Sequence, residues 1–208
     1  MPMTETSGRP GNPAPPARAI VCSGHMIDAF GRKQPRFPPR MEEAVRLRIA
    51  EQLAQWNAGA PDVGICGGAC GADILFAETC LERRARVLLL IPLPEDAFLE
   101  QSVAFAGADW VVRYRALRNR CETRFQHEAL GPPAQGENVF ERNNLWCLDT
   151  ARALVPFDRI HAILVWDEMP AGDGPGGTAE FAARVAEGGG CVAVINPTRL
   201  QRPGSSIR

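Results

Sequence analysis

Long apolar runs are missing from this sequence of 208 residues, and their absence excludes one class of protein. No stretch approaches the roughly 18 consecutive apolar residues that a membrane-spanning helix needs. The segment 1–18 is rich in Pro, Gly, Ser and Thr and lacks the apolar part of a secretion signal. We therefore expect neither a membrane partner nor export.

A strong net charge is also lacking, because 23 Lys and Arg residues face 24 Asp and Glu residues. A net charge of −1 gives no overall field that attracts nucleic acid. Five arginines nevertheless gather between Arg113 and Arg124. This segment is a solvated helix, a phosphate-facing loop or, as the weakest alternative, an RNA-binding face. We expect no nucleic-acid partner.

The seven cysteines form no zinc-binding pattern. Cys66 and Cys70 are spaced like half of a metal site, but no second Cys/His pair has the required spacing. Several of the seven lie in or beside apolar runs, where cysteine acts as a small buried residue. We expect no metal, no cofactor, reduced thiols and a cytoplasmic location.

Short apolar runs alternate with helical patterns over residues 18–198. The predicted strands are 19–23, 62–66, 87–91, 160–166 and 191–196, and the predicted helices are 41–56, 72–84, 96–105, 140–154 and 178–187. Because the strands lack polar alternation, both faces of the sheet should be covered. The pattern predicts one α/β domain with a doubly wound, mainly parallel sheet, between a disordered tail (1–17) and a loose tail (199–208).

The segment 109–139 is harder to interpret. Its pattern predicts a strand at 110–112, followed by a loop that ends in Gly131-Pro132-Pro133.

Two glycine-rich turns each follow a predicted strand and open a predicted helix. The first contains Gly67, Gly68, Gly71 and Asp73, and the second contains Gly176, Gly177 and Thr178. Glycine lets the backbone approach a phosphate, and the N–H groups that begin a helix attract anions. The turns therefore predict a site for a nucleotide-like small molecule, although two tight turns without a ligand are the alternative.

Neither turn has the Gly-x-Gly-x-x-Gly of dinucleotide folds or the Gly-Lys-Ser/Thr of phosphate loops. Residues 18–197 instead resemble the SLOG superfamily of Rossmann-like domains. This superfamily includes lonely-guy type phosphoribohydrolases, the DNA-processing protein Smf and nucleotide-sensing domains. Three segments carry the resemblance: Gly67-Gly68-Ala69-Cys70-Gly71-Ala72-Asp73, Phe140-Glu141-Arg142-Asn143-Asn144 and Pro175-Gly176-Gly177-Thr178-Ala179-Glu180.

The resemblance implies a catalytic role for Glu180, which matches the carboxylate of the phosphoribohydrolases, and for Arg142, which matches their arginine. Alternatively, Glu180 complements the helix dipole and Arg142 is an exposed charge at a helix start. The second glycine motif lacks two positions of the family pattern, and Asn143 replaces a lysine. Both departures favour ligand binding without hydrolysis.

Further candidate ligand-binding residues follow from their positions in the predicted elements. Gly24 and His25 follow the first strand, so they should lie at the ligand edge of the sheet, where His25 contacts a ligand or is a loop residue. Asp73 caps a helix or meets a ribose hydroxyl. Asn143 bonds either to the ligand or to the backbone.

Three function hypotheses therefore stand. The chain binds a nucleotide-derived molecule and hydrolyses its N-glycosidic bond, or it senses such a molecule without chemistry, or, as the weakest, it binds single-stranded nucleic acid. We also expect a homodimer, because the apolar residues of the predicted helix 140–154 cannot all face one side. These residues are Phe140, Leu145, Trp146 and Leu148.

Overall fold

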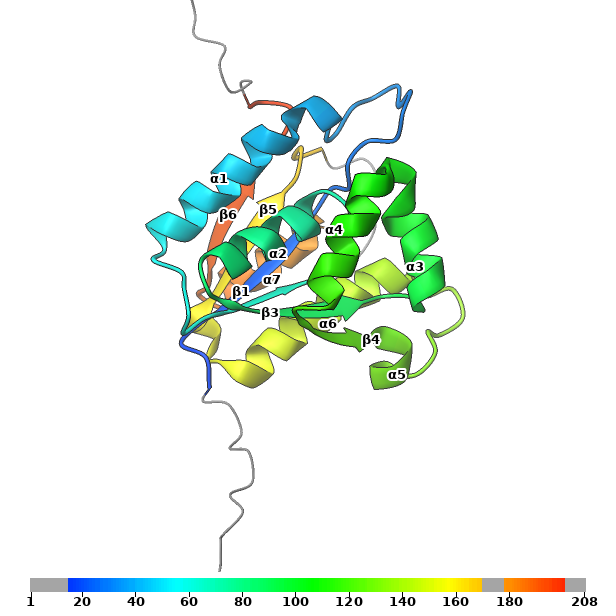
Figure 1. Ribbon diagram of the computed structural model, residues 1–208. Helices are drawn as coiled ribbons and strands as arrows, with labels where there is room; N and C mark the ends of the chain where they lie inside the picture. Colours follow the sequence, from blue (N-terminus) through cyan, green and yellow to red (C-terminus); the bar gives the residue numbers. More distant parts are fainter. Residues whose placement is uncertain (1–14, 170–177, 201–208) are drawn as a thin grey trace, which may run out of the picture.

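A six-stranded, entirely parallel sheet forms the centre of the protein (Figure 1). The computed structural model describes residues 15–169 and 178–200, so the predicted tails lie mostly outside the described residues. The strand order is β4-β3-β2-β1-β5-β6. The strands are β1 (Ala19–Gly24), β2 (Val63–Cys66), β3 (Arg86–Ile91), β4 (Glu122–Phe125), β5 (Ile160–Val165) and β6 (Cys191–Ile195).

Helices cover both faces of this sheet (Figure 1). One face packs against α1 (Glu42–Gln55), α2 (Ala72–Glu82), α3 (Glu95–Ser102) and α4 (Ala108–Arg118), and the other against α6 (Val139–Leu154) and α7 (Thr178–Glu187). Shorter helices are η1 (Pro39–Met41), η2 (Ala104–Ala106), α5 (Gln126–Leu130) and η3 (Phe157–Arg159).

The strands are apolar on both faces because each face has its own core. In β1, Ile20 and Cys22 belong to the core under α1 and α2, whereas Ala19 and Val21 belong to the core under α6 and α7. Successive side chains of a strand point to opposite faces, so an unbroken apolar run fills both cores. The predicted doubly wound α/β fold is confirmed.

The strand predicted at 110–112 is wrong, because these residues lie inside helix α4. Trp110, Tyr114 and Leu117 are the buried residues of this helix. Their spacing of four and three residues places them on one helical face, which packs into the core. The helical period of these residues outweighs the short β-branched run at Val111 and Val112.

The edge strand β4 and the short helix α5 were not predicted. The strand Glu122-Thr123-Arg124-Phe125 alternates exposed and half-buried residues and carries two charged side chains. Charged side chains are common on edge strands, because they discourage pairing with other chains. An edge strand with Phe125 as its one apolar residue therefore gives almost no apolar signal.

The expected homodimer rests on four apolar residues of helix α6, which differ in how far they are exposed. Trp146 and Leu148 are buried against the sheet, Leu145 is half-buried and Phe140 is 42% exposed. Two of the four apolar residues thus have partners within the chain, and the homodimer stays a prediction. None of the described helices is long and apolar enough to cross a membrane.

Strands β1 and β5 approach closely at their carboxyl ends, where Gly24 pairs with Val165. A Cβ atom at position 24 would lie 2.5 Å from the carbonyl oxygen of Val165 and 2.8 Å from its Cβ. The next residue continues the contact, because His25 N donates to the same carbonyl oxygen at 2.8 Å. Gly24, predicted as a ligand contact, is thus also required for strand packing.

We expect Gly24→Ala to destabilise the fold, because the added methyl group overlaps the backbone of β5. Overpacking of this kind costs about 1–3 kcal/mol, which corresponds to a Tm lower by roughly 3–10 °C in a domain of this size. Gly59→Ala is the matched control, because its Cβ would meet only Arg83 O at 3.5 Å. Thermal unfolding followed by circular dichroism measures both variants, and equal Tm values would contradict the prediction.

Candidate functional site

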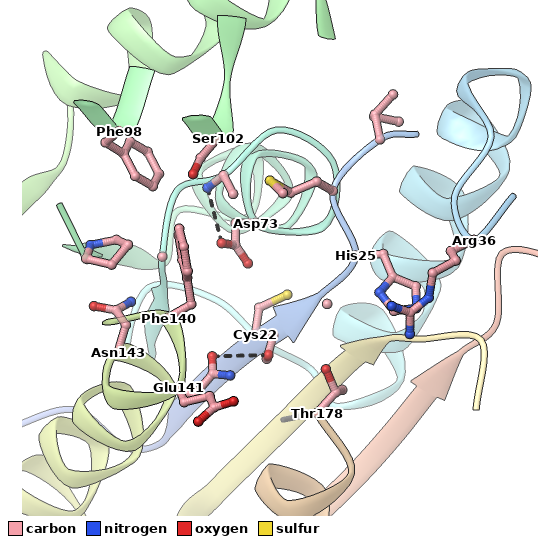
Figure 2. A pocket seen from close by; sticks show the side chains of 18 of the residues that line it. Cys22, His25, Arg36, Asp73, Phe98, Ser102, Phe140, Glu141, Asn143 and Thr178 are labelled. Carbon is pink, nitrogen blue, oxygen red and sulfur yellow. Dashed lines mark hydrogen bonds between the residues drawn. The ribbon is translucent and has the colours of Figure 1, made fainter. Parts of the chain in front are cut away.

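The candidate site is a cavity at the point where the strand order reverses. Strand β1 lies between β2 and β5, so the loops after β1 and β5 diverge at the carboxyl edge of the sheet. A cavity of about 500 Å³ opens there (Figure 2). Its walls come from the end of β1, the turn after β2, α3, the first turns of α6 and the start of α7. This volume lies within the range of small-molecule sites.

Six of the predicted binding residues line this cavity: Gly24, His25, Gly67, Asp73, Asn143 and Thr178. The structure thus brings together the end of the first strand, the first glycine turn, α6 and the start of α7. Gly176 and Gly177 lie outside the described residues. The two glycine turns were expected to converge at one site. Of the second turn the structure describes only Thr178, which lines the same cavity as Gly67 of the first turn.

Gly68 and Gly71 shape the first turn and do not line the cavity. Their φ angles are +79° and +98°, which side chains rarely adopt. At Gly71 a Cβ atom would also lie 2.7 Å from the backbone nitrogen of Ile27. These two glycines are needed for the fold, so substituting them does not test ligand binding alone.

Asp73 is half-buried in the first turn of α2, and its carboxylate bonds back to the first glycine turn, where the sequence predicts an anionic ligand. Its Oδ2 atom accepts a hydrogen bond from Ala69 N at 3.2 Å. Burial raises the pKa of Asp73 from 3.8 to about 7, and the N–H groups of Ala69, Gly67 and Gly68 oppose this rise. The turn therefore directs its donors at a side chain of this protein.

Thiols, rather than cations, surround Asp73. Burial raises the pKa of nearby thiols, and the charge of Asp73 adds a smaller contribution in the same direction. These thiols, which stay neutral at physiological pH, belong to Cys22, Cys66, Cys70 and Cys147. Cys66 and Cys70 are both buried and reduced. No group of His, Cys, Asp and Glu among the described residues could hold a metal ion.

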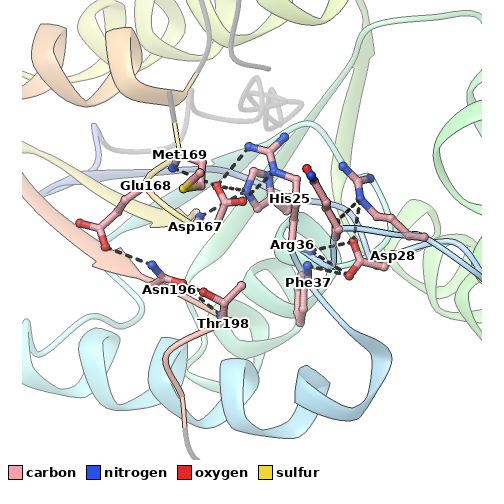
Figure 3. A network of polar contacts seen from close by, with 11 residues as sticks. His25, Asp28, Arg36, Phe37, Asp167, Glu168, Met169, Asn196 and Thr198 are labelled. Carbon is pink, nitrogen blue, oxygen red and sulfur yellow. Dashed lines mark hydrogen bonds and ion pairs between the residues drawn. The ribbon is translucent and has the colours of Figure 1, made fainter. Parts of the chain in front are cut away.

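A second polar group closes the opposite side of the cavity (Figure 3). Asp167, just after β5, accepts hydrogen bonds from Arg36 Nε at 2.9 Å and Arg36 Nη2 at 3.2 Å. His25 Nε2 lies 3.1 Å from Asp167 Oδ1. Burial alone would raise the pKa of Asp167, but hydrogen bonds from Arg36, His25 and the backbone N–H of Met169 hold it well below its usual range.

The loop between β1 and α1 is held in place by Asp28. Its carboxylate accepts hydrogen bonds from Arg36 N and Phe37 N, both at 3.0 Å, and lies 3.5 Å from Arg32 Nε. The two arginines among the described lining residues, Arg32 and Arg36, and His25 all belong to this loop. Arg32 pairs with Asp28 and Arg36 with Asp167, so the arginines of the cavity and their acidic partners lie on the side of the β1–α1 loop.

Asparagines of α6 form the third wall. Asn143 Nδ2 donates to Leu90 O at 2.8 Å, and its Oδ1 accepts from Gln126 Nε2 at 3.3 Å. Asn143 therefore connects α6 to β3. Of its two predicted roles, a bond to the ligand or a bond to the backbone, the structure shows the bond to the backbone. The hydroxyl of Ser23 lies 3.3 Å from Asn144 Oδ1.

Glu180 and Arg142 are not among the described residues that line the cavity. Glu180 Oε1 accepts from Arg184 Nε at 3.0 Å, an ion pair along one face of α7. The Arg142 guanidinium donates to the carbonyls of Gly131 at 3.0 Å and Leu130 at 2.9 Å. The structure places the two residues on different helices, and each has partners within its own neighbourhood.

Two features of the lining were not predicted. Phe105 of η2 and Phe140 of α6 line the cavity and are 41% and 42% exposed, so aromatic rings are open to a ligand. Ser102 is fully buried at the end of α3, and its hydroxyl has no hydrogen-bond partner among the described residues. No sequence pattern indicates Ser102, whereas Asp167 could have been found as a polar residue shortly after a buried strand.

The arginine-rich segment 113–124 is largely neutralised by acidic neighbours. Arg113 pairs with Glu42 and Glu78, Arg118 Nε lies 2.9 Å from Glu95 Oε1, and Arg124 pairs with Glu122. The pairs of Arg113 and Arg118 join α4 to α1, α2 and α3, and the pair of Arg124 lies within β4. They agree with a charged helix and give no support to an RNA-binding face.

Comparison with models of known protein families finds no match to this chain, and comparison with curated proteins finds none either. The resemblance to the SLOG superfamily therefore stays a prediction from the three sequence segments.

The raised pKa of Asp73 predicts how stability depends on pH. The folded state holds a proton that the unfolded state releases, so the free energy of unfolding falls as pH rises from about 4 to about 7. Asp73→Asn removes this penalty and still offers an oxygen to Ala69 N–H. We expect the variant to gain several degrees in Tm over wild type at pH 8 and little at pH 4.5.

Asp109→Asn is the matched control, because Asp109 lies exposed in the first turn of α4, whereas Asp73 lies half-buried in the first turn of α2. Thermal unfolding at both pH values measures the three proteins. A Tm difference between wild type and Asp73→Asn that does not change with pH would contradict a raised pKa.

Proposed function

We propose that this protein binds a nucleotide or a nucleotide-derived small molecule in the cavity beside β1 and acts as a sensor rather than as a hydrolase. The observation that carries the proposal is the position of the cavity, at the reversal of strand order in a doubly wound parallel sheet. In such sheets, ligands bind outside the carboxyl ends of the strands at this point.

The composition of the walls supports a ligand with chemically different parts. Exposed rings of Phe105 and Phe140 offer stacking surfaces for a base. His25, Arg32 and Arg36 offer positive charge and hydrogen-bond donors on the opposite side, where an anionic group fits best. A molecule with a planar base and an anionic end matches both surfaces.

The positions of Glu180 and Arg142 favour binding without hydrolysis. Cleavage of an N-glycosidic bond needs a carboxylate near the developing cation of the sugar. In the described residues, Glu180 is engaged by Arg184, and Arg142 binds the carbonyls before α6. Hydrolysis by this pair would require both side chains to leave these partners. A homodimer and a cytoplasmic location remain part of the proposal as the means and place of signalling.

We expect Phe140→Ala to weaken nucleotide binding by about tenfold or more, because a base loses a stacking partner worth roughly 1–3 kcal/mol. Phe30→Ala is the matched control, since Phe30 is fully exposed and is not part of the cavity lining. Isothermal titration calorimetry with ribonucleoside 5′-monophosphates measures wild type and both variants. Equal affinities of wild type and Phe140→Ala would exclude this stacking surface, and no binding by wild type would contradict the proposed function.

We expect wild-type protein to release no free base from nucleoside monophosphates or dinucleotides, because the predicted catalytic pair does not line the cavity. Chromatography of the incubated mixtures, with protein-free incubations and Glu180→Gln as controls, measures the base. Release by wild type that Glu180→Gln abolishes would establish the hydrolase hypothesis instead. Equal release by both proteins would show hydrolysis in which Glu180 has no part.

A further inference from the structure

We propose that the first glycine turn binds sugar hydroxyls rather than phosphate, and that Asp73 and Ser102 determine specificity for a ribose diol. This inference rests on the proposed function and names which part of the ligand meets which wall of the cavity. Asp73 and Ser102 lie on one side of the cavity, away from His25 and Arg36 on the other (Figure 2).

The backbone N–H donors of the first glycine turn bond to Asp73. A phosphate bound at a glycine turn is held by backbone N–H groups that point at it. Here the N–H of Ala69 donates to Asp73 Oδ2, and a Cβ atom at Gly67 would lie only 3.0 Å from the same oxygen. A phosphate at this place would meet a carboxylate where it needs a donor, so the turn disfavours an anion.

The carboxylate of Asp73 is a hydrogen-bond acceptor beside the first glycine turn and lines the cavity. A carboxylate accepts hydrogen bonds at two oxygens and is suited to the hydroxyl groups of a sugar. Asp73 lines the cavity while its Oδ2 is held by the turn, so its position is fixed before a ligand arrives. A preorganised acceptor of this kind selects ligands that bring O–H donors.

The hydroxyl of Ser102 is the second polar group of the proposed subsite. Its backbone carbonyl accepts from Cys70 N at 2.9 Å, which fixes the end of α3 against the glycine turn. Ser102 lines the cavity and is fully buried, yet its Oγ has no partner among the described residues. A buried hydroxyl without a partner is costly, so a ligand oxygen that accepts and donates here is favoured.

The arginines that line the cavity lie in the β1–α1 loop, away from Asp73. The groups whose pKa responds to the charge of Asp73 are thiols, which belong to Cys22, Cys66 and Cys147. The wall at Asp73 therefore suits the neutral, hydroxyl-bearing part of a nucleotide. The anionic part then points toward His25, Arg32 and Arg36.

The experiment compares each of the four ribonucleoside 5′-monophosphates with its 2′,3′-dideoxy form by calorimetry at pH 8. We expect wild type to bind at least one ribonucleotide about tenfold or more tightly than its dideoxy form, since each hydrogen bond lost to a charged group costs about 1.5–3 kcal/mol. We expect Asp73→Asn and Ser102→Ala each to reduce this ratio by several-fold.

Thr79→Val is the matched control, because it removes a buried hydroxyl of α2 that bonds to Leu75 O and does not line the cavity. Circular dichroism shows that each variant is folded. Equal affinity of wild type for ribo and dideoxy forms would overturn the diol subsite and leave the proposed function standing. An unchanged ratio in both Asp73→Asn and Ser102→Ala would exclude these residues, and no binding of any nucleotide would overturn both proposals.

Discussion

The parallel pairing of β1 with β5 is the constraint on which the fold and the candidate site depend. Six consecutive residue pairs join the two strands, from Ala19 and Ile160 to Gly24 and Val165. The chain leaves β1 toward α1 on one face and leaves β5 toward α7 on the other, so the connections at this edge diverge and leave a cavity. The close approach at Gly24 also brings His25 within 3.1 Å of Asp167. Packing of two backbones thus positions the polar wall.

The carboxylate of Asp73 changes what the first glycine turn can do. A glycine turn with unoccupied N–H groups attracts phosphate, whereas the turn around Asp73 presents an acceptor to the cavity. Burial of this carboxylate raises its pKa to about 7, against the opposing effect of the backbone N–H groups of the turn. The cavity therefore has a carboxylate on the side of the glycine turn and, on the side of the β1–α1 loop, two arginines that pair with Asp28 and Asp167.

The central strands could be predicted from the sequence because each is an apolar run that fills two cores at once. The edge strand β4 could not, since Glu122 and Arg124 face solvent and Phe125 is its one apolar residue that packs against the core. Helix α4 was assigned wrongly because the local run at Val111 and Val112 favours a strand. The burial of Trp110, Tyr114 and Leu117 against α2 and α3 decides for a helix.

The candidate site was predictable where a residue follows a strand or opens a helix, as His25, Asp73 and Thr178 do. It was not predictable where long-range packing decides, because nothing in the local sequence places Ser102 beside the turn at Cys70. The same limit applies to Glu180 and Arg142, whose motif positions say nothing about Arg184 or the carbonyls of Leu130 and Gly131. Motif resemblance identifies which residues could react, whereas their partners decide whether they face a ligand. In this protein those partners hold Glu180 away from the cavity, whereas the carboxylates of Asp28, Asp73 and Glu141 line it.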